Sequence, residues 1–209
     1  EGTKRSMKER RIVFATGNEN KMKEIRMILE DLGMPVISMK EAGAYVDAEE
    51  NGSTFEENAM IKASAVSALL PEDIVLADDS GLEIDCLDKA PGIYSARFAG
   101  TDTPYEIKNK MFLEKLQGVP EEKRTARFVC AIAAVFPGGV EKTLRGTMEG
   151  RIAEKAAGLN GFGYDPIFWL PEYGCTSAEL APEKKNEISH RGKALRAMKK
   201  KIEAYIAEK

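Results

Sequence analysis

Ala77-Asp78-Asp79-Ser80-Gly81-Leu82 is the stretch around which the fold of this chain is predicted. It follows Asp73-Ile74-Val75-Leu76-Ala77, an apolar run rich in β-branched residues that predicts a short strand. Ligands of α/β proteins gather where strands end, so the acids and the hydroxyl are candidates for a site there. Side chains alternate between faces along an extended chain, and Asp78 and Asp79 are expected to point in different directions. Taken alone, Asp-Ser-Gly favours a solvated turn.

A strand, a turn and a helix are predicted upstream of this stretch. Residues 12–15 form an apolar run, which breaks at Thr16-Gly17-Asn18, and a helical pattern then continues to Gly33. Such a turn can present backbone N–H groups and the positive end of a helix dipole to an anion, with Lys21 adding charge. It is not a P-loop, because GxxxxGK[ST] is absent from the sequence. The turn could also be a simple connection.

An acidic loop over residues 47–52 precedes the next predicted helix, which runs to about Leu70. Two registers of a capping box are possible at its start, Ser53 with Glu56 or Thr54 with Glu57. Asn58 and Lys62 are four residues apart and share a helix face, which is either solvated or part of a site.

The segments after the opening stretch predict a mixed sheet. Residues 83–87 alternate like a half-buried strand, and residues 127–136 and 140–152 read as a long antiparallel hairpin around Pro137-Gly138-Gly139. Residues 104–116 form an amphipathic helix whose inward face is predicted to contain Ile107, Met111, Phe112 and Leu116.

Residues 158–166 then place three glycines, two aromatic residues and an acid in nine positions. Thr176 and Glu179 are spaced as a capping box for a short helix that stops near Pro182, and Ser189 can cap the last helix. The fold class is therefore predicted to be α/β, with a mixed β-sheet flanked by helices, two lobes and a central cleft. Residues 1–10 are expected to be an N-terminal extension or an expression remnant, and residues 11–209 a single two-lobed domain.

Composition restricts the class of protein. The 209 residues can bury one sizeable core, and 31% charged with 43% hydrophobic residues is ordinary for a soluble protein. A net charge of −3 gives no basic footprint for nucleic acid, and no apolar run approaches the roughly 20 residues that span a bilayer. Three widely spaced cysteines fit a reducing compartment. We therefore expect a cytoplasmic protein that acts on small molecules, without nucleic-acid or membrane partners.

Four polar clusters could carry chemistry. Magnesium prefers one or two carboxylates together with water and substrate phosphates, and the candidate ligands are Glu49, Glu50, Asp78 and Asp79. Phe162 could stack on a base, while Lys185 and Arg191 could donate to ring carbonyls or neutralise phosphate. His190 is the only histidine, which excludes a three-histidine zinc site, and Ser80 lacks the GxSxG context of a hydrolase nucleophile. A single histidine at a helix start is also a common cap.

Five motifs occur in one order, and together they resemble the inosine/xanthosine triphosphate pyrophosphatase family over residues 12–204. These motifs are Thr16-Gly17-Asn18 with Lys21, Ala77-Asp78-Asp79-Ser80-Gly81-Leu82, Pro91-Gly92 with Ser95-Ala96-Arg97-Phe98, Phe162-Gly163-Tyr164-Asp165-Pro166, and Ser189-His190-Arg191. The resemblance implies a homodimer with a nucleoside triphosphate substrate. It also implies Mg²⁺-dependent hydrolysis of ITP, dITP and XTP to the monophosphate and pyrophosphate.

The resemblance also implies roles for individual residues. Asp79 matches the general base and a metal ligand, and Glu49 matches the second metal ligand, with Glu50 as a less certain register. The substrate-binding residues would be Thr16, Gly17, Asn18, Glu19, Asn20, Lys21, Ser80, Phe162, Gly163, Tyr164, Asp165, Lys185, His190 and Arg191. Asn58 and Lys62 would line the phosphate side. Two alternatives are a nucleotide-binding regulatory module without turnover and a phosphatase that releases single phosphates.

Overall fold

The structure is a computed structural model that describes residues 10–208. Most of the predicted N-terminal extension, residues 1–9, lies outside that range. The described strands form one eight-stranded sheet in the order β2-β1-β3-β5-β6-β7-β8, with β4 paired to β3. The β1–β2 and β1–β3 pairs are parallel, whereas β3–β4, β6–β7 and β7–β8 are antiparallel. The predicted mixed α/β sheet is therefore confirmed, while the central cleft stays a prediction.

The chain divides into two compact units. Unit 1 contains the residues up to Asp79, Cys130–Gly146 and the residues from Gly192 on, and unit 2 contains Ser80–Val129 and Thr147–Arg191. Both units are therefore built from segments that are distant in the sequence.

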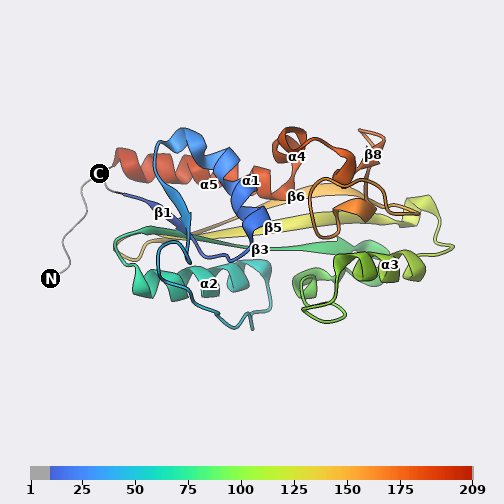
Figure 1. The fold of residues 1–209 in the computed structure, drawn as a ribbon, viewed down its shortest axis with the longest axis horizontal. Helices are drawn as coiled ribbons and strands as arrows, with labels where there is room; N and C mark the ends of the chain where they lie inside the picture. Colours follow the sequence, from blue (N-terminus) through green and yellow to red (C-terminus); the bar gives the residue numbers. More distant parts are fainter. Residues whose placement is uncertain (1–9, 209) are drawn as a thin grey trace. The chain divides into compact units, whose positions relative to one another are not determined.

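Alternation along the strands explains the three layers of unit 1 (Figure 1). Its strands are β1 (Ile12–Phe14), β2 (Val36–Ser38) and parts of β3 (Ile74–Ile84), β5 (Thr125–Val135) and β6 (Glu141–Ile152). One set of alternate residues, such as Ile12 and Leu76, packs with α1 (Glu19–Leu29) and α5 (His190–Ala207). The other set, such as Val13 and Val75, packs with α2 (Phe55–Leu69) on the opposite face. Burial on both faces accounts for the nearly continuous apolar runs.

The opening stretch differs from its prediction. The sequence predicts a strand that ends at Ala77 and a new strand from Glu83, but β3 continues without a break from Ile74 to Ile84. Asp78 and Asp79 therefore lie within a strand, and both are buried. The turn-like composition is misleading here because the charged partners of these acids come from other segments, which local sequence does not reveal.

Unit 2 has its own core, in which α3 (Tyr105–Lys115) packs by Phe112 against strand residues such as Leu82 and Phe128. The remaining strands are β4 (Ala90–Pro91), β7 (Phe168–Leu170) and β8 (Cys175–Thr176). The predicted inward face of α3 is partly wrong. Phe112 and Leu116 are buried, but Ile107 is 50% exposed, and Lys108 and Asn109 are buried in its place.

Helix starts were partly predictable. Thr54 is the N-cap of α2, and its side chain accepts from the backbone N–H of Glu57, as the second of the two registers predicts. The reciprocal bond differs, because the Glu57 carboxylate accepts from the backbone N–H of Ser53 rather than from that of Thr54. The Thr176–Glu179 capping box is confirmed, but it begins only a short 3-10 turn. Pro182 then starts α4 (Pro182–Ile188) rather than ending a helix, because proline is well tolerated in a first helical turn.

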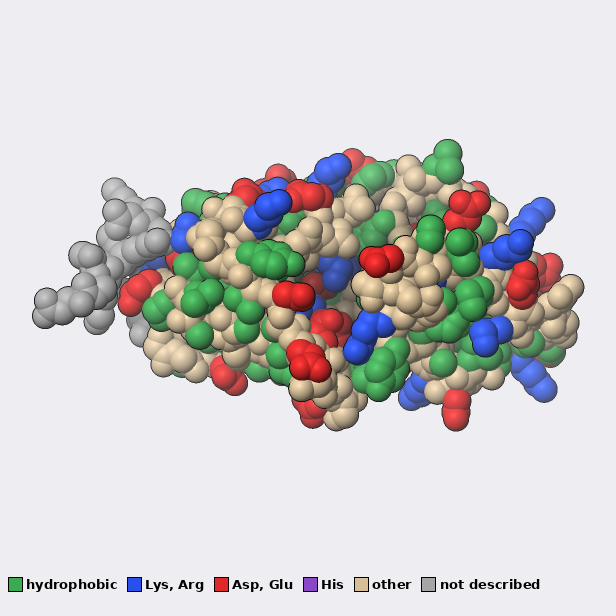
Figure 2. All heavy atoms as spheres, turned by 60° about the horizontal axis from the view of Figure 1, so that its bottom comes forward, with side chains coloured by type: hydrophobic (Ala, Val, Ile, Leu, Met, Phe, Trp, Pro, Cys, Tyr) green, Lys and Arg blue, Asp and Glu red, His purple; other side chains and the backbone are tan. Residues whose placement is uncertain are grey.

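Two further observations concern the charges on the surface and the character of the helices. On the face drawn in Figure 2, Lys and Arg side chains are interspersed with Asp and Glu. Within residues 10–208, no helix combines the length and the apolar character that a membrane crossing requires.

Candidate active site

A cluster of charged side chains surrounds Asp79 in unit 1. Asp78 is 1% exposed, and its carboxylate is paired with Lys21 Nζ of α1 at 3.4 Å. Lys62 of α2 is paired with Glu50 at 2.7 Å. Burial lowers the pKa of Lys62, but the negative charges of Asp78, Glu50 and Asp79 together outweigh burial, so that the pKa is raised. The cluster thus contains three carboxylates and two lysines from four separate segments of the chain.

Asp79 is the member of this cluster with an unpartnered oxygen and a raised pKa. It is 9% exposed, and its Oδ2 atom is buried without a hydrogen-bond partner among the described residues. Burial raises the pKa of Asp79 to about 6, and the charges of Glu50 and Asp78 add to this, while Lys62 and Lys21 lower it. A carboxylate with this pKa is ionised at neutral pH and has an oxygen available to a cation or to a water proton.

The two adjacent acids have different surroundings, as alternation along the strand predicts. Asp78 contacts Lys21 of α1 and the thiol of Cys130 of β5. The positive charge that acts most strongly on Asp79 is Lys62 of α2.

The acidic loop brings Glu50 into the cluster, whereas Glu49 is exposed at the surface. The buried Asn58 side chain fixes this loop, because its Oδ1 accepts from the backbone N–H of Gly52 at 2.8 Å. Within residues 10–208, no three His, Cys, Asp or Glu side chains are grouped closely enough to hold a metal ion by themselves. The carboxylates at Asp79 nevertheless have the hard oxygens and the unpartnered atom that suit Mg²⁺.

The turn after β1 leads directly into α1. Asn18 is the N-cap, and its side chain accepts from the backbone N–H groups of Asn20 and Lys21. Gly17, Glu19 and Asn20 are exposed, while Thr16 and Lys21 are half-buried. A helix N-terminus with a lysine beside it is a favourable place for an anion. The structure thus brings Lys21 to the acid cluster and leaves most of the turn at the surface.

In unit 2, Asp165 organises the glycine-rich loop. Its carboxylate accepts from the backbone N–H of Phe162 at 3.0 Å, from Ser177 Oγ at 2.9 Å and from Lys185 Nζ at 2.6 Å. Asp165 and Lys185 are both buried, so their ion pair is screened little by solvent. The Lys185 ammonium also lies 4.8 Å from the centroid of the Phe162 ring.

The last motif reaches the same ring. Arg191 is 2% exposed, lies 5.6 Å from the Phe162 ring centroid and donates to Ser80 Oγ at 3.0 Å. His190 stacks on Phe128 at 4.8 Å between ring centroids. The structure therefore brings Lys185 and Arg191 to the Phe162 ring, whereas the ring contact of His190 is with Phe128. The sequence does not predict the contact of Ser177 with Asp165, because a serine within the Thr176–Glu179 capping box gives no sign of a buried partner elsewhere in the chain.

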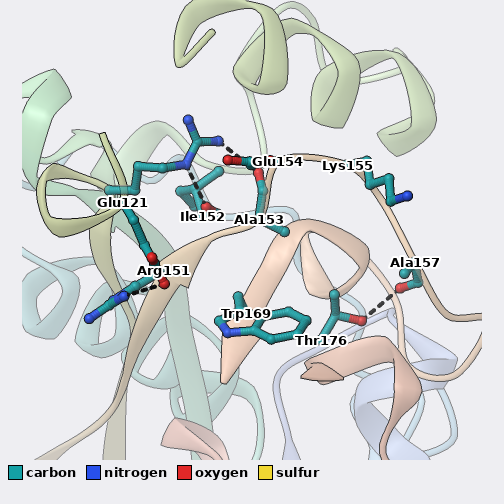
Figure 3. A pocket seen from close by; sticks show the side chains of 10 residues that line it. Glu121, Arg151, Ile152, Ala153, Glu154, Lys155, Ala157, Trp169 and Thr176 are labelled. Atoms are coloured by element: carbon teal, nitrogen blue, oxygen red, sulfur yellow. Dashed lines mark hydrogen bonds and ion pairs between the residues drawn. The ribbon is translucent and has the colours of Figure 1, made fainter. Parts of the chain in front are cut away.

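Unit 2 also has a pocket with a different set of lining residues (Figure 3). It has a volume of about 360 Å³, with Trp169 in its wall and an ion pair between Arg151 and Glu121 at 2.6 Å. Thr176 closes another part of the wall by donating to the carbonyl oxygen of Ala157. None of the site residues predicted from the sequence lines this pocket.

Comparison with known proteins identifies the family. A family model described as the Ham1 family matches residues 12–201. The chain belongs to the Ham1 family. This membership confirms the resemblance that the five ordered motifs indicate.

Relatives of this Ham1 chain match over nearly their full length. A protein of Exiguobacterium sibiricum named dITP/XTP pyrophosphatase is 46% identical over 198 residues, which cover 95% of this chain and 100% of the relative. A Desulforamulus reducens protein of the same name is 49% identical over 186 residues, 89% of this chain and 92% of the relative.

Solved structures show the same fold. The Staphylococcus aureus Ham1 protein has a TM-score of 0.83 and 41% identity, over 94% of this chain and 100% of that one. A HAM1 protein from Coxiella burnetii has a TM-score of 0.82 and 40% identity, over 93% and 99% of the two chains.

Proposed function

We propose that this chain hydrolyses deaminated purine nucleoside triphosphates, namely ITP, dITP and XTP, to the monophosphate and pyrophosphate. The observation that carries the proposal is the buried Asp79 carboxylate, with one unpartnered oxygen beside Lys62 and Lys21. Membership of the Ham1 family supports it, since relatives that are nearly half identical are named dITP/XTP pyrophosphatase. Such an enzyme removes damaged purines from the nucleotide pool.

Asp79 is proposed to act as the general base. Its carboxylate takes a proton from a water molecule whose oxygen attacks the α-phosphorus, and the bond from that phosphorus to the bridging oxygen breaks. Pyrophosphate then leaves with the electron pair of that bond. A base whose pKa is about 6 is suited to this transfer at neutral pH. Lys21 and Lys62 offset the negative charge that accumulates on the phosphate oxygens.

We propose that Mg²⁺ binds at Asp79 together with Glu49 or Glu50. When bound, the ion would neutralise phosphate oxygens and lower the pKa of a bound water. Sequence resemblance favours Glu49, whereas the contacts of the acid cluster favour Glu50. Isothermal titration with Mg²⁺ on Glu49→Gln and Glu50→Gln separates the two, because the variant of the true ligand should lose affinity roughly tenfold or more.

Base selection is assigned to the residues around Phe162. The ring offers a face on which a purine can stack, and Lys185 and Arg191 supply positive charge beside it. Donors that face the 6-oxo group of hypoxanthine or xanthine would be left unpaired opposite the 6-amino group of adenine. That difference discriminates strongly against ATP.

Turnover of a nucleotide panel tests the proposed function. We expect kcat/KM for ITP, dITP and XTP to exceed the value for ATP by at least about a hundredfold, with pyrophosphate as the product and with a requirement for Mg²⁺. Release of orthophosphate alone would point to a phosphatase. Nucleotide binding without turnover would point to a regulatory module.

The family resemblance also leads us to propose a homodimer. Light scattering on the purified protein at micromolar concentration should give about twice the mass of one chain, which is 23.0 kDa. A monomer under these conditions would contradict this part of the proposal.

A further inference from the structure

Helix α3 buries two polar side chains where the sequence predicts apolar ones. Lys108 and Asn109 are 1% and 4% exposed, whereas the neighbouring Ile107 is 50% exposed. Burial of an amide or an ammonium group costs free energy unless hydrogen bonds compensate it. The contacts of the two side chains therefore indicate their role.

Asn109 is bonded to the loop that carries Phe162. Its Nδ2 donates to the carbonyl oxygen of Gly163 at 3.2 Å. Only the NH₂ group of an amide can donate to a carbonyl, so this bond fixes which way the side chain faces. The Oδ1 atom of Asn109 then has no hydrogen-bond partner among residues 10–208. The hydrogen bond of the buried Asn109 amide is therefore made to this loop.

One side of this loop borders an open pocket. A cavity of about 490 Å³ lies along α3 and the loop, and Tyr105, Asn109, Leu113, Gly161, Phe162 and Gly163 are among its lining residues. Leu159, at the loop tip, is fully exposed. Because no side chain fills the pocket on this side, specific bonds such as the one from Asn109 contribute to the position of the loop.

Helix α3 is itself well anchored. Lys108 donates its Nζ to the carbonyl oxygen of Ala96 at 2.8 Å. The Tyr164 hydroxyl donates to the carbonyl oxygen of Ser95 at 2.5 Å, and its ring meets the Tyr105 ring edge-on at 5.0 Å. The loop and the helix thus share the segment around Ser95 as a common support.

We propose that Asn109 is a positioning residue for base selection, because its bond to the Gly163 carbonyl holds Phe162 where it can stack on the purine. The proposal rests on the proposed function. Asn109 acts through the loop rather than by touching the substrate, so its loss changes substrate preference more than the rate of the chemical step.

Asn109→Leu tests this role, since leucine has a similar volume, is a good helix former and cannot donate a hydrogen bond. We expect the melting temperature to stay within a few degrees of wild type. The ratio of kcat/KM for ITP over ATP should fall about fivefold to tenfold, mainly through KM for ITP. Calorimetric binding of IMP and AMP without metal should show the same loss of preference.

Asn160→Ala is the matched control. Asn160 lies in the same loop, and its Nδ2 donates to the carbonyl oxygen of Leu180 at 3.0 Å, but its side chain is exposed. This variant should keep the wild-type ITP preference. If Asn109→Leu is poorly folded, Asn109→Ala carries the same expectation.

The outcomes separate the inference from the proposed function. A wild-type protein that treats ITP and ATP alike would overturn both. A selective wild type with an equally selective Asn109→Leu variant would overturn only the role of Asn109. An equal loss of kcat/KM for both substrates, or failure of both Asn109 variants to fold, would show that Asn109 is a structural residue and would also overturn the inference.

Discussion

Asp79 carries its charge in a place that disfavours it. Its ordinary pKa is 3.8, and burial together with Glu50 and Asp78 raises it to about 6. Between these values the folded protein holds a proton that the unfolded chain has lost, so the stability contributed by Asp79 falls as the pH rises from about 4 to 6. Above pH 6 the full cost is about 3 kcal/mol, because one pKa unit corresponds to about 1.4 kcal/mol.

Asp79→Asn should therefore stabilise the protein while it removes activity. We expect the free energy of unfolding to rise by about 1–3 kcal/mol at pH 7.5, with a smaller gain at pH 4.5. Urea titrations in EDTA at both pH values measure this, and turnover of ITP should fall to background. Asp85→Asn is a control of opposite sign, since hydrogen bonds from Arg127 lower the pKa of Asp85 and this variant should lose stability at pH 7.5. Turnover near wild type would remove Asp79 from its catalytic role.

Lys185 combines a proposed role in base selection with a structural one. It is predicted to read the base, and it also neutralises the buried Asp165 carboxylate at 2.6 Å. Lys185→Ala should lower the ITP-over-ATP ratio more than kcat, and it should cost about 3–5 kcal/mol of stability because Asp165 is left unpaired.

Steady-state kinetics and thermal unfolding check both effects, with Lys184→Ala as the control. Lys184 is exposed and pairs with Glu187, so its loss should change stability by less than about 1 kcal/mol. If Lys185→Ala weakens ITP and ATP equally, Lys185 does not read the base.

At the scale of elements, β6 and β7 pack unusually closely beside Gly150. An added Cβ at Gly150 would lie 2.5 Å from the Trp169 carbonyl oxygen and 2.6 Å from the Phe168 ring. Gly150→Ala should therefore destabilise the protein by about 1–3 kcal/mol. Urea unfolding followed by circular dichroism measures the loss. Gly17→Ala should leave stability unchanged, since its Cβ would meet only Tyr45, at 4.0 Å. Equal stabilities would show that the two strands can move apart freely.

Elements with strong periodicity could be predicted from the sequence. The hairpin of β5 and β6, the helices α1 and α2 and the Thr176 capping box all follow from local patterns. The continuous β3 strand could not be predicted, because Asp78 and Asp79 are compensated by lysines 57 and 17 residues away in the sequence, Lys21 and Lys62. The buried polar residues of α3 were missed for the same reason, since the Nδ2 of Asn109 donates to a loop residue 54 positions later, Gly163.

The candidate site shows the same limit. Family resemblance predicts Lys185 and Asp165 as substrate-binding residues, but their ion pair and its link to Phe162 required the structure. The choice between Glu49 and Glu50 depends on which side chain turns toward Lys62, and adjacent identical residues give no sequence signal for that.

At the scale of the whole molecule, the two units are joined by the chain at four places. The chain passes from one unit to the other after Asp79, Val129, Gly146 and Arg191. Three of these passages lie within the strands β3, β5 and β6, and the fourth lies within α5. Unfolding of one unit would break strands that continue into the other, so we expect a single cooperative transition.

Two built-in probes can measure this cooperativity. Trp169 is the only tryptophan and reports on unit 2, while the buried thiol of Cys130 reports on unit 1. In a Cys86→Ser, Cys175→Ser background, fluorescence and thiol labelling should give the same urea midpoint. Midpoints that differ by more than about 0.5 M would show that the units unfold separately.

The unbroken β3 strand also has a consequence for how the gene can change in length. Successive residues of this strand contact Lys21, respond to the charge of Lys62, and bind Arg191. One inserted or deleted residue between Ile74 and Ile84 would turn the later side chains of this strand to the opposite face of the sheet. Insertions are expected to be tolerated in turns such as residues 137–139, whereas this strand can vary only by substitution.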